Sequence, residues 1–441
     1  MTEREWREAI DMRSSPGTVG LVLVSAALLR FWNLGHGVVS APEQQTIEAV
    51  LGLMRTGSYH PPALVQPALA IYLHASVASV HFLLGAARGV WASVADFGSS
   101  QVLPWGRGVS ALLGTAVVFV VYQVGMRWGA RHALLAAGLM AVAPTHVAAS
   151  REVSAASPLT LAAAVTLLLS MEAVERGKRA RLVAAGVGAG LAAAAHYAGA
   201  LLLVTPLVAV WMTPDNPTPR STRAWLVVGA AVGAFAIANP MSVRDLPAFL
   251  NGYAITASPN GMDALTASGI FRQLVWAMQW PGLILALSGL ALGIVRAVSG
   301  PGHTRWTLLV SFPAVYFGAV AWHGATWNQI LVPLLPSATL LAGTAVVSGV
   351  SLLRRFDIPR PARTALIAAL TVLVILPPAI ASIEVVREAG RERLTIARTE
   401  GQPLECVAND QLAAAMPEGL RYVESPRRDD VVAESNVAQP S

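Results

Sequence analysis

The chain has 441 residues, of which 54% are hydrophobic and only 13% are charged. A mean hydropathy of +0.55 and repeated apolar runs near the roughly 20 residues that cross a bilayer core predict an all-α, polytopic helical membrane protein. The runs are too long and too uniformly apolar for the strands of a membrane β-barrel, which alternate apolar and polar residues. The single cysteine, Cys406, excludes an intramolecular disulfide framework and a cysteine-based metal site.

The formal net charge of +6 and the pI near 10.0 raise the question of a nucleic-acid partner. The arginines, however, fall in short clusters between the apolar runs, which is typical of cytoplasmic loops under the positive-inside rule. We therefore expect a lipid bilayer as a partner and no nucleic acid. The predicted inner loops are Arg127–Arg131, Arg176–Arg181, Pro214–Arg223, Arg296–Arg305 and Arg354–Arg363.

The first span is predicted at residues 18–32, after a cytoplasmic tail of residues 1–17 that carries mixed charges and no cleavage signal. This tail could form a short interfacial helix or stay solvated. The span would lead into a long first outer loop, residues 34–107. Within that loop, apolar residues at helical spacing predict a membrane-surface helix from Glu43 to Arg55 that stops at Gly57.

Residues 64–87 are apolar enough to cross the membrane, but a crossing would move the 127–131 and 176–181 clusters to the outer side. We therefore expect a re-entrant or surface-lying helix there. The remaining spans give about 11 transmembrane helices in residues 18–383, followed by a partly disordered extracytoplasmic tail, 384–441. They are predicted at 108–125, 132–147, 158–174, 182–195, 198–212, 224–241, 273–296, 306–322, 327–351 and 363–383.

Charged and aromatic residues concentrate where several predicted spans reach the outer side. Such residues are costly at membrane depth unless they have partners, which favours a shared cavity. No internal sequence repeat is found, so a transporter built on inverted repeats gains no support. The residues that converge are Glu43 from the first loop, Arg151 and Glu152, His196 and Tyr197, and Arg244 and Asp245.

Structural explanations exist for several of these residues. A glutamate in a loop, such as Glu43, is most often solvated, and Arg151 could anchor the chain at the membrane interface. His60 precedes two prolines and could fix a turn, because a residue before proline is restricted to extended conformations. His146 is expected to be a packed residue at a helix end.

The order of short motifs resembles a known family. The motifs are LRFWNLG at 29–35, LMRTG at 53–57, HPP at 60–62, PTHVAASRE at 144–152, AHYAG at 195–199, NP at 239–240, DLPAFL at 245–250 and LVPLLP at 331–336. Together they resemble the membrane-embedded GT-C glycosyltransferases, in particular the bacterial family 39 proteins related to protein O-mannosyltransferases and aminoarabinose transferases. The resemblance covers about residues 18–351.

The resemblance implies sugar transfer from a polyprenyl-phosphate donor to a glycan, lipid or protein acceptor, on the extracytoplasmic face of the bacterial cytoplasmic membrane. Such a transfer needs a carboxylate base and groups that stabilise the departing phosphate. Glu43 would be the base or would bind a donor-orienting metal, and Glu152 would be a second catalytic carboxylate. Arg151 would face phosphate. The other expected substrate-binding residues are His60, His196, Tyr197, Arg244, Asp245 and Gln329.

Three departures from the family pattern are found. Pro42 stands where members commonly have an aspartate, the second acidic residue expected after the Ser150 motif falls on Ala156 or Ser157, and Asn328-Gln329 replaces an aromatic and basic pair. The first two keep an alternative open. Few carboxylates remain for a hard cation, which prefers several oxygen ligands, so Glu43 and Glu152 are the only ones considered for a divalent metal. The alternative is a catalytically weakened GT-C-like protein that binds a lipid-linked glycan or acts as a subunit of a cell-envelope assembly.

Overall fold

A computed structural model describes residues 16–35, 39–60, 66–213, 219–257, 267–299, 302–323, 329, 331–353, 356 and 359–398. The chain divides into two compact units, Met1–Gly390 and Arg391–Ser441. Only the last helix reaches into the second unit within the described residues. The predicted N-terminal tail and the end of the predicted C-terminal tail, from residue 399, lie outside the described residues.

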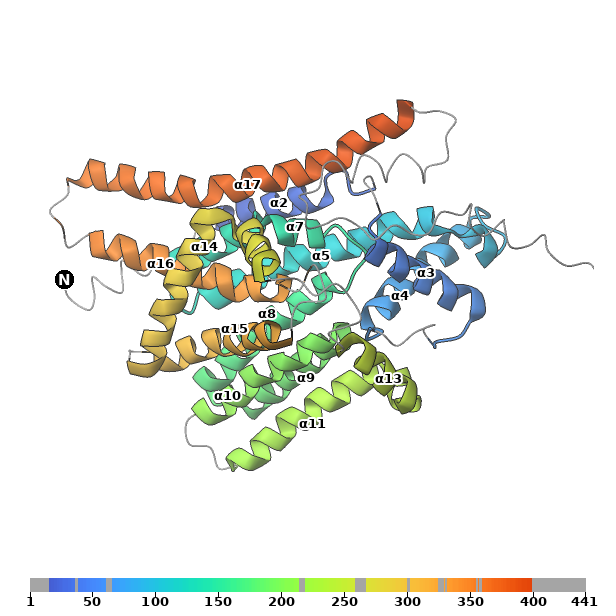
Figure 1. The fold of residues 1–441 in the computed structure, drawn as a ribbon, viewed down its shortest axis with the longest axis horizontal. Helices are drawn as coiled ribbons and strands as arrows, with labels where there is room; N and C mark the ends of the chain where they lie inside the picture. The colour runs from blue at the N-terminus through green and yellow to red at the C-terminus, as the bar shows by residue number, and fades with distance from the viewer. Residues whose placement is uncertain are drawn as a thin grey trace, which may run out of the picture. The chain divides into compact units, whose positions relative to one another are not determined.

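Every regular element of the described chain is helical (Figure 1), which confirms the all-α prediction. The helices are α2 (Pro16–Phe31), α3 (Ala41–Thr56), α4 (Leu69–Ala87), η1 (Val94–Asp96), α5 (Ser99–Gly125), α6 (Ala130–Ala141), α7 (Pro144–Ala149), α8 (Ala156–Arg176), α9 (Arg179–Ala195), η2 (Tyr197–Leu203), α10 (Val204–Met212), α11 (Arg220–Ala238), α12 (Pro240–Arg244), α13 (Leu246–Ala257), α14 (Ala267–Ser299), α15 (His303–His323), η3 (Val332–Leu334), α16 (Leu335–Leu353) and α17 (Arg360–Arg398).

Seven helices of the described residues are long and apolar enough to cross a membrane, so the chain is a polytopic membrane protein. They are α4, α5, α8, α11, α14, α16 with η3, and α17. Helix α2 and the η2–α10 segment are apolar but shorter. The predicted number of about 11 spans is therefore not confirmed by helix length and hydropathy.

Several helices differ from the predicted spans. The predicted span 132–147 is divided into α6 and α7, because Pro144 begins a new helix. Helix α5 begins at Ser99, inside the predicted outer loop, because Gln101 caps its start by accepting a hydrogen bond from the Gly98 N–H at 2.9 Å. Helix α17 continues to Arg398, so the first part of the predicted tail is helical. Helix α14 is kinked at Gln279, which has φ 56° and stands two residues before Pro281, a residue that interrupts helical hydrogen bonding.

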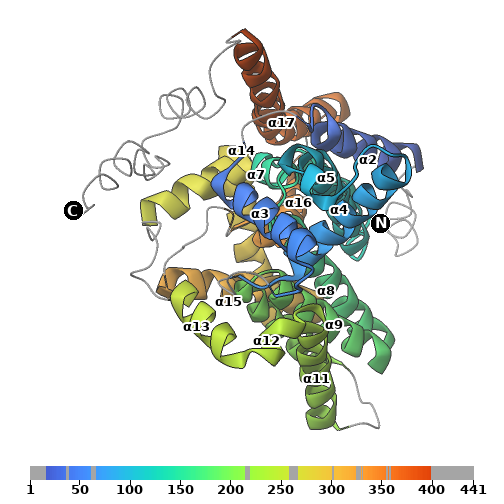
Figure 2. The same ribbon diagram turned by 90° about the vertical axis from the view of Figure 1, so that its right-hand side faces the viewer.

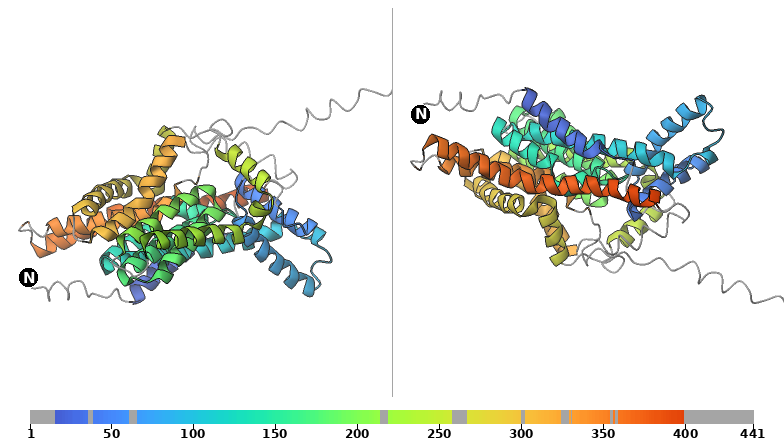
Figure 3. Two further views of the ribbon diagram at one scale, coloured as in Figure 1. Left: turned by 90° about the horizontal axis from the view of Figure 1, so that it is seen from below. Right: turned by 90° about the horizontal axis from the view of Figure 1, so that it is seen from above.

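The range of helix α3 agrees closely with the helix predicted from Glu43 to Arg55, and its place on the membrane surface stays a prediction. Ser40 caps its first turn by accepting a hydrogen bond from the Glu43 N–H, and Gly57 ends it in the left-handed conformation with φ 65°. Ile47, Val50 and Leu51 are buried on one face. Helices α3 and α4 lie together at one end of the long helices (Figures 1 and 3), which we call the site end. This place suits a re-entrant or surface-lying α4, and its failure to cross stays a prediction.

At the opposite end, an ion-pair network joins loops that were predicted to share one side of the membrane. Arg127 pairs with Glu172 and Glu175, Arg181 pairs with Glu172, and Arg305 pairs with Glu175. These residues come from the ends of α5, α8, α9 and α15. The network therefore gathers three of the five predicted basic loops at one end of the bundle.

Small residues let α9 and α11 approach closely (Figures 1 and 2). A methyl group at Gly186 would lie 2.5 Å from the Val227 carbonyl oxygen, and one at Gly190 would lie 2.1 Å from that of Ala231. Both distances are shorter than atoms tolerate, so neither glycine can be replaced without separating the helices. Close backbone approach at small residues is a main source of helix association in membranes.

Gly190→Ala is therefore expected to destabilise the protein by about 1–3 kcal/mol, because its methyl group overlaps the α11 backbone. Thermal unfolding in detergent would measure the loss. Gly229→Ala is the matched control, since a methyl group there meets no atom within 4 Å. Equal unfolding temperatures for the two variants would contradict the close packing of α9 on α11.

Candidate functional site

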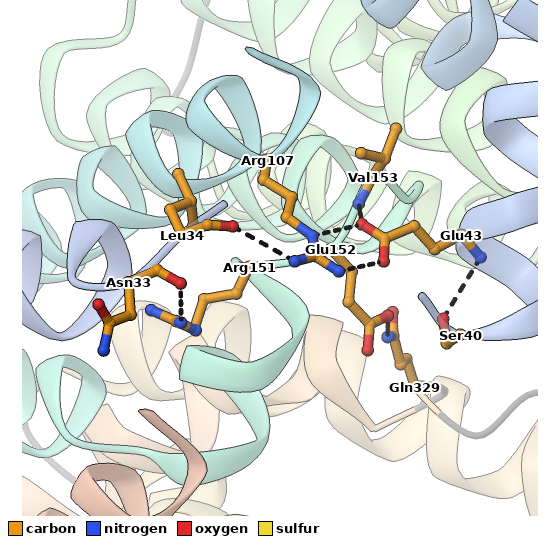
Figure 4. Close-up of polar contacts among 9 residues, drawn as sticks. All are labelled: Asn33, Leu34, Ser40, Glu43, Arg107, Arg151, Glu152, Val153 and Gln329. Atoms are coloured by element: carbon orange, nitrogen blue, oxygen red, sulfur yellow. Dashed lines mark hydrogen bonds and ion pairs between the residues drawn. The ribbon is translucent and has the colours of Figure 1, made fainter. Parts of the chain in front are cut away.

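Glu43 lies in the first turn of α3. It is therefore not the solvated loop residue that its sequence position suggested. Its side chain is fully buried. Arg107, from the third turn of α5, donates to it through both Nε and Nη2, at 2.8 Å to Oε1 and 2.7 Å to Oε2. The Val153 N–H donates to Oε1 at 2.8 Å. Figure 4 shows these donors converging on the carboxylate.

This bidentate pair is nearly closed to solvent, since Arg107 is also buried. Charge-assisted bidentate bonds are the strongest of the common protein hydrogen bonds. Removing one partner would leave a buried charge without compensation, which is far more costly than keeping the pair. The pair therefore fixes α3, α5 and the 151–155 loop relative to one another.

Arg151 is directed away from Glu43, toward the end of α2 (Figure 4). Its guanidinium donates to the carbonyl oxygens of Leu29, Arg30, Trp32 and Asn33, with the shortest distance, 2.6 Å, to Trp32. Carbonyls at a helix C-terminus lack partners within the helix and carry partial negative charge. Arg151 thus caps α2, and the contact with phosphate stays a prediction.

Glu152 occupies a different environment from Glu43. The residue is half-buried, and its carboxyl accepts a hydrogen bond from the Gln329 amide nitrogen, while the Ser154 hydroxyl donates to the amide oxygen of Gln329 at 3.4 Å. Burial, followed by the nearby Glu43 charge, raises the pKa of Glu152 to about 7. A carboxyl with such a pKa exchanges protons near neutral pH, as a general base or acid requires.

A second group of predicted residues forms around α12 and α13. His60 Nε2 lies 3.3 Å from Asp245 Oδ2, and both side chains are partly exposed. Asp245 also caps α13 by accepting from the Ala248 N–H at 3.1 Å. The Tyr197 ring packs edge to face on Phe249 and Tyr253. His60, Tyr197 and Asp245 thus come from three separated segments to one region.

Arg244 and His196 complete the predicted set. Arg244 is exposed, and within the described part of the chain no hydrogen bond or ion pair is found for it. His196 is buried at the junction of α9 and η2, where its Nδ1 accepts a hydrogen bond from the Ala198 N–H at 3.2 Å. Burial lowers the pKa of His196 to about 4. The imidazole is therefore neutral and serves as a cap.

The residues do not fit a divalent metal. Hard cations prefer several oxygen ligands, whereas both oxygens of Glu43 already accept hydrogen bonds from Arg107. Across the described ranges, no group of three or more His, Cys, Asp or Glu side chains is arranged to hold an ion.

Arg107 and Arg30 were missed as functional candidates in the sequence. Arg107 stood at the edge of a predicted loop, although one arginine in an apolar segment is itself a signal for a buried partner. Arg30 is fully buried and donates to the Ala141 carbonyl at 3.0 Å and to His146 Nδ1 at 2.7 Å. The expectation that His146 is a packed residue is confirmed.

Comparisons with known proteins bear on the family and the fold. Residues 97–255 match the family described as dolichyl-phosphate-mannose-protein mannosyltransferase, a segment that includes Arg107 and Glu152 but less than half of the chain. A comparison with curated proteins found no match.

Solved structures show the same fold. ArnT from Cupriavidus metallidurans, bound to undecaprenyl phosphate, is 16% identical, with a TM-score of 0.58 over 85% of this chain and 75% of that one. The oligosaccharyltransferase AglB from Archaeoglobus fulgidus, with an inhibitory peptide and a dolichol-phosphate, is 14% identical, with a TM-score of 0.56 over 83% of this chain. This chain covers only 56% of AglB. The fold is that of the GT-C membrane glycosyltransferases, which confirms the resemblance.

Glu43→Ala is expected to destabilise the protein by about 3–5 kcal/mol, because it leaves the Arg107 guanidinium buried and unpaired. Replacing both residues, as Glu43→Ala with Arg107→Met, should recover a large part of this loss, and Arg107→Met alone completes the comparison. Unfolding temperatures of the single and double variants in detergent provide the comparison. Additive losses in the double variant would show that the two side chains do not act as a pair.

Proposed function

We propose that this protein transfers a sugar from a polyprenyl-phosphate donor to an acceptor glycan, lipid or protein. The reaction would take place at the site end of the helices, on the extracytoplasmic side of the bacterial cytoplasmic membrane. The match to a mannosyltransferase family and the shared fold with ArnT and AglB support this reaction class. The observation that carries the proposal is the half-buried Glu152, which accepts a hydrogen bond from Gln329 and whose pKa is raised to about 7 by burial and by the nearby Glu43 charge.

In the proposed reaction, Glu152 is the general base. It removes the proton from an acceptor hydroxyl as that oxygen attacks the anomeric carbon. A new bond forms between the acceptor oxygen and the sugar, and the bond from the sugar to the phosphate oxygen breaks. The polyprenyl phosphate leaves with the electron pair of that bond. Gln329 would orient the carboxyl through its amide hydrogen bond.

Glu43 takes a supporting role in this proposal, in contrast to its expected role as the base. Its carboxylate would have to give up three hydrogen bonds before it could accept a proton. By holding Arg107 and the Val153 N–H, it fixes the loop that carries Glu152. Its negative charge also favours the protonated form of Glu152, which raises the basicity of that carboxylate.

Substrate contacts are assigned to residues with exposed polar or aromatic surface. Arg244 would pair with the donor phosphate, since its guanidinium is exposed and planar cations suit phosphate oxygens. His60 and Asp245 would bind sugar hydroxyls, and Tyr197 would offer part of an aromatic surface to a sugar ring. His196 would act indirectly, by shaping the turn before Tyr197.

The buried state of Glu43 also favours a second candidate function. If that carboxylate is needed for transfer, its pairing with Arg107 leaves a protein that binds a lipid-linked glycan, or serves a cell-envelope assembly, without catalysis. Binding of undecaprenyl phosphate to the protein in nanodiscs, with no transfer from any donor, would favour this function. Turnover by the wild type would exclude it.

Glu152→Gln is expected to lower the transfer rate by about 10²–10⁴-fold, the usual contribution of a general base. The assay would supply a panel of polyprenyl-phosphate sugars to purified protein in nanodiscs and measure the polyprenyl phosphate released. Gln is isosteric with Glu, so folding should be retained. Glu48→Gln is the control, because this glutamate lies on the exposed side of α3. Full activity of Glu152→Gln would contradict the assignment.

The transfer rate is also expected to rise with pH up to about 7 and then level off. The pKa of Glu152 lies above its ordinary value of 4.5, so the neutral form, which cannot accept a proton, predominates below pH 7. The rate should therefore fall about tenfold for each pH unit well below this value. A flat profile between pH 5 and pH 8, in protein that stays folded, would remove Glu152 from the role of base.

A further inference from the structure

A buried histidine, His74, lies next to the 151–155 loop that carries Glu152. His74 belongs to α4, on the face that packs toward α5, where Ala70, Ala78 and Gly85 are the other buried residues. The imidazole thus interrupts a row of very small side chains. It is only 1% exposed. Burying one polar ring in such a row costs free energy unless the ring is hydrogen-bonded or serves a function.

The position of the ring is defined by its neighbours. A methyl group built on Gly106 would lie 3.5 Å from His74 Nδ1 and 2.8 Å from Val153 Cγ2, so the ring and the loop meet at the same glycine. Gly106 directly precedes Arg107, which holds Glu43. The ring also lies against the main chain of Ser154. Neither ring nitrogen makes a hydrogen bond of good geometry to any part of the chain that is described.

The 151–155 loop has two other supports. On one side, the Val153 N–H donates to Glu43. On the other side, the Ser154 hydroxyl bonds to the Gln329 amide, which in turn bonds to Glu152. Ser154 also accepts a hydrogen bond from the Ala156 N–H at the start of α8. His74 contacts this loop near Gly106 of α5. Its ring can therefore limit how closely the loop approaches α5.

We propose that His74 is a positioning residue for Glu152. Its imidazole supports the Ser154 main chain, directly or through one bridging water, and holds the loop at the depth that keeps Glu152 beside Glu43. Buried polar atoms without partners commonly mark such a water or a functional constraint. The inference rests on the proposed function only for its effect on the rate.

The pKa of Glu152 can be used to measure this positioning role. The groups that set its proton affinity are Glu43 from α3, which raises the pKa, and Arg107 from α5, which lowers it, in addition to burial. If the loop moves outward, the carboxyl gains solvent and its distance from Glu43 increases. Both changes lower the pKa of Glu152 toward its ordinary value.

The test is an infrared titration of the Glu152 carboxyl in nanodiscs, with Glu152→Gln as the spectroscopic blank. His74→Leu should lower the midpoint by about one pH unit or more. His74→Gln, which restores an amide donor and acceptor, should stay near the wild type. His81→Leu is the matched control, since His81 lies two turns further along α4 and packs on Trp91, Phe97 and Trp105.

Thermal unfolding shows whether each variant is folded. If His74→Leu is not, His74→Phe replaces it, because the phenyl ring fills the space of the imidazole. An unchanged midpoint in folded His74→Leu and His74→Phe would overturn the proposal. So would an equal shift in His74→Gln, because the effect would then come from volume alone. This titration needs no turnover, so it decides the role of His74 even if the wild type transfers no sugar.

Where transfer is measurable, His74→Leu should reduce kcat by about tenfold and leave KM nearly unchanged, because a positioning residue acts on the base and not on substrate binding. The rising limb of its pH profile should move to lower pH with the titration midpoint. A rise in KM at constant kcat would instead assign His74 to the binding site and contradict the proposal.

Discussion

The buried ion pair between Glu43 and Arg107 is the interaction on which the site depends. It joins α3, α5 and, through the Val153 N–H, the loop before α8. The charges are almost fully removed from solvent, so each is stable only in the presence of the other. The pair thereby ties α3 to the long helix α5 at the site end of the bundle.

The pair also separates the roles of two neighbouring carboxylates. Glu43 accepts three hydrogen bonds, two from the Arg107 guanidinium and one from the Val153 N–H. Glu152 accepts one amide hydrogen bond, and burial, followed by the repulsion of Glu43, raises its pKa to about 7. Two carboxylates with different environments are a common way to place one proton-exchanging group in an active site. In our account the polar residues that surround this loop, including His74 and Gln329, preserve that difference.

Features with a local cause could be predicted from the sequence. The face of α3 with Ile47, Val50 and Leu51, and its end at Gly57, follow from helical periodicity and from the conformational freedom of glycine. The partner of Glu43 could not be predicted, because Arg107 is 64 residues away and one sequence does not show long-range pairing. The carbonyl groups bound by Arg151 and the Val153 N–H are main-chain atoms, which have no signature in the sequence. The functional expectation moved from Glu43 to Glu152 for these reasons.

The central claim is that Glu43 supports the site while Glu152 faces the reactants. The most direct measurement is an experimental structure of the protein in nanodiscs with bound undecaprenyl phosphate. Our account predicts that the Glu43–Arg107 pair stays intact, that the phosphate lies on the exposed side of Glu152, and that Arg244 approaches it. A structure in which Arg107 leaves Glu43 to bind the phosphate, or in which Glu43 coordinates a metal at the phosphate, would contradict it.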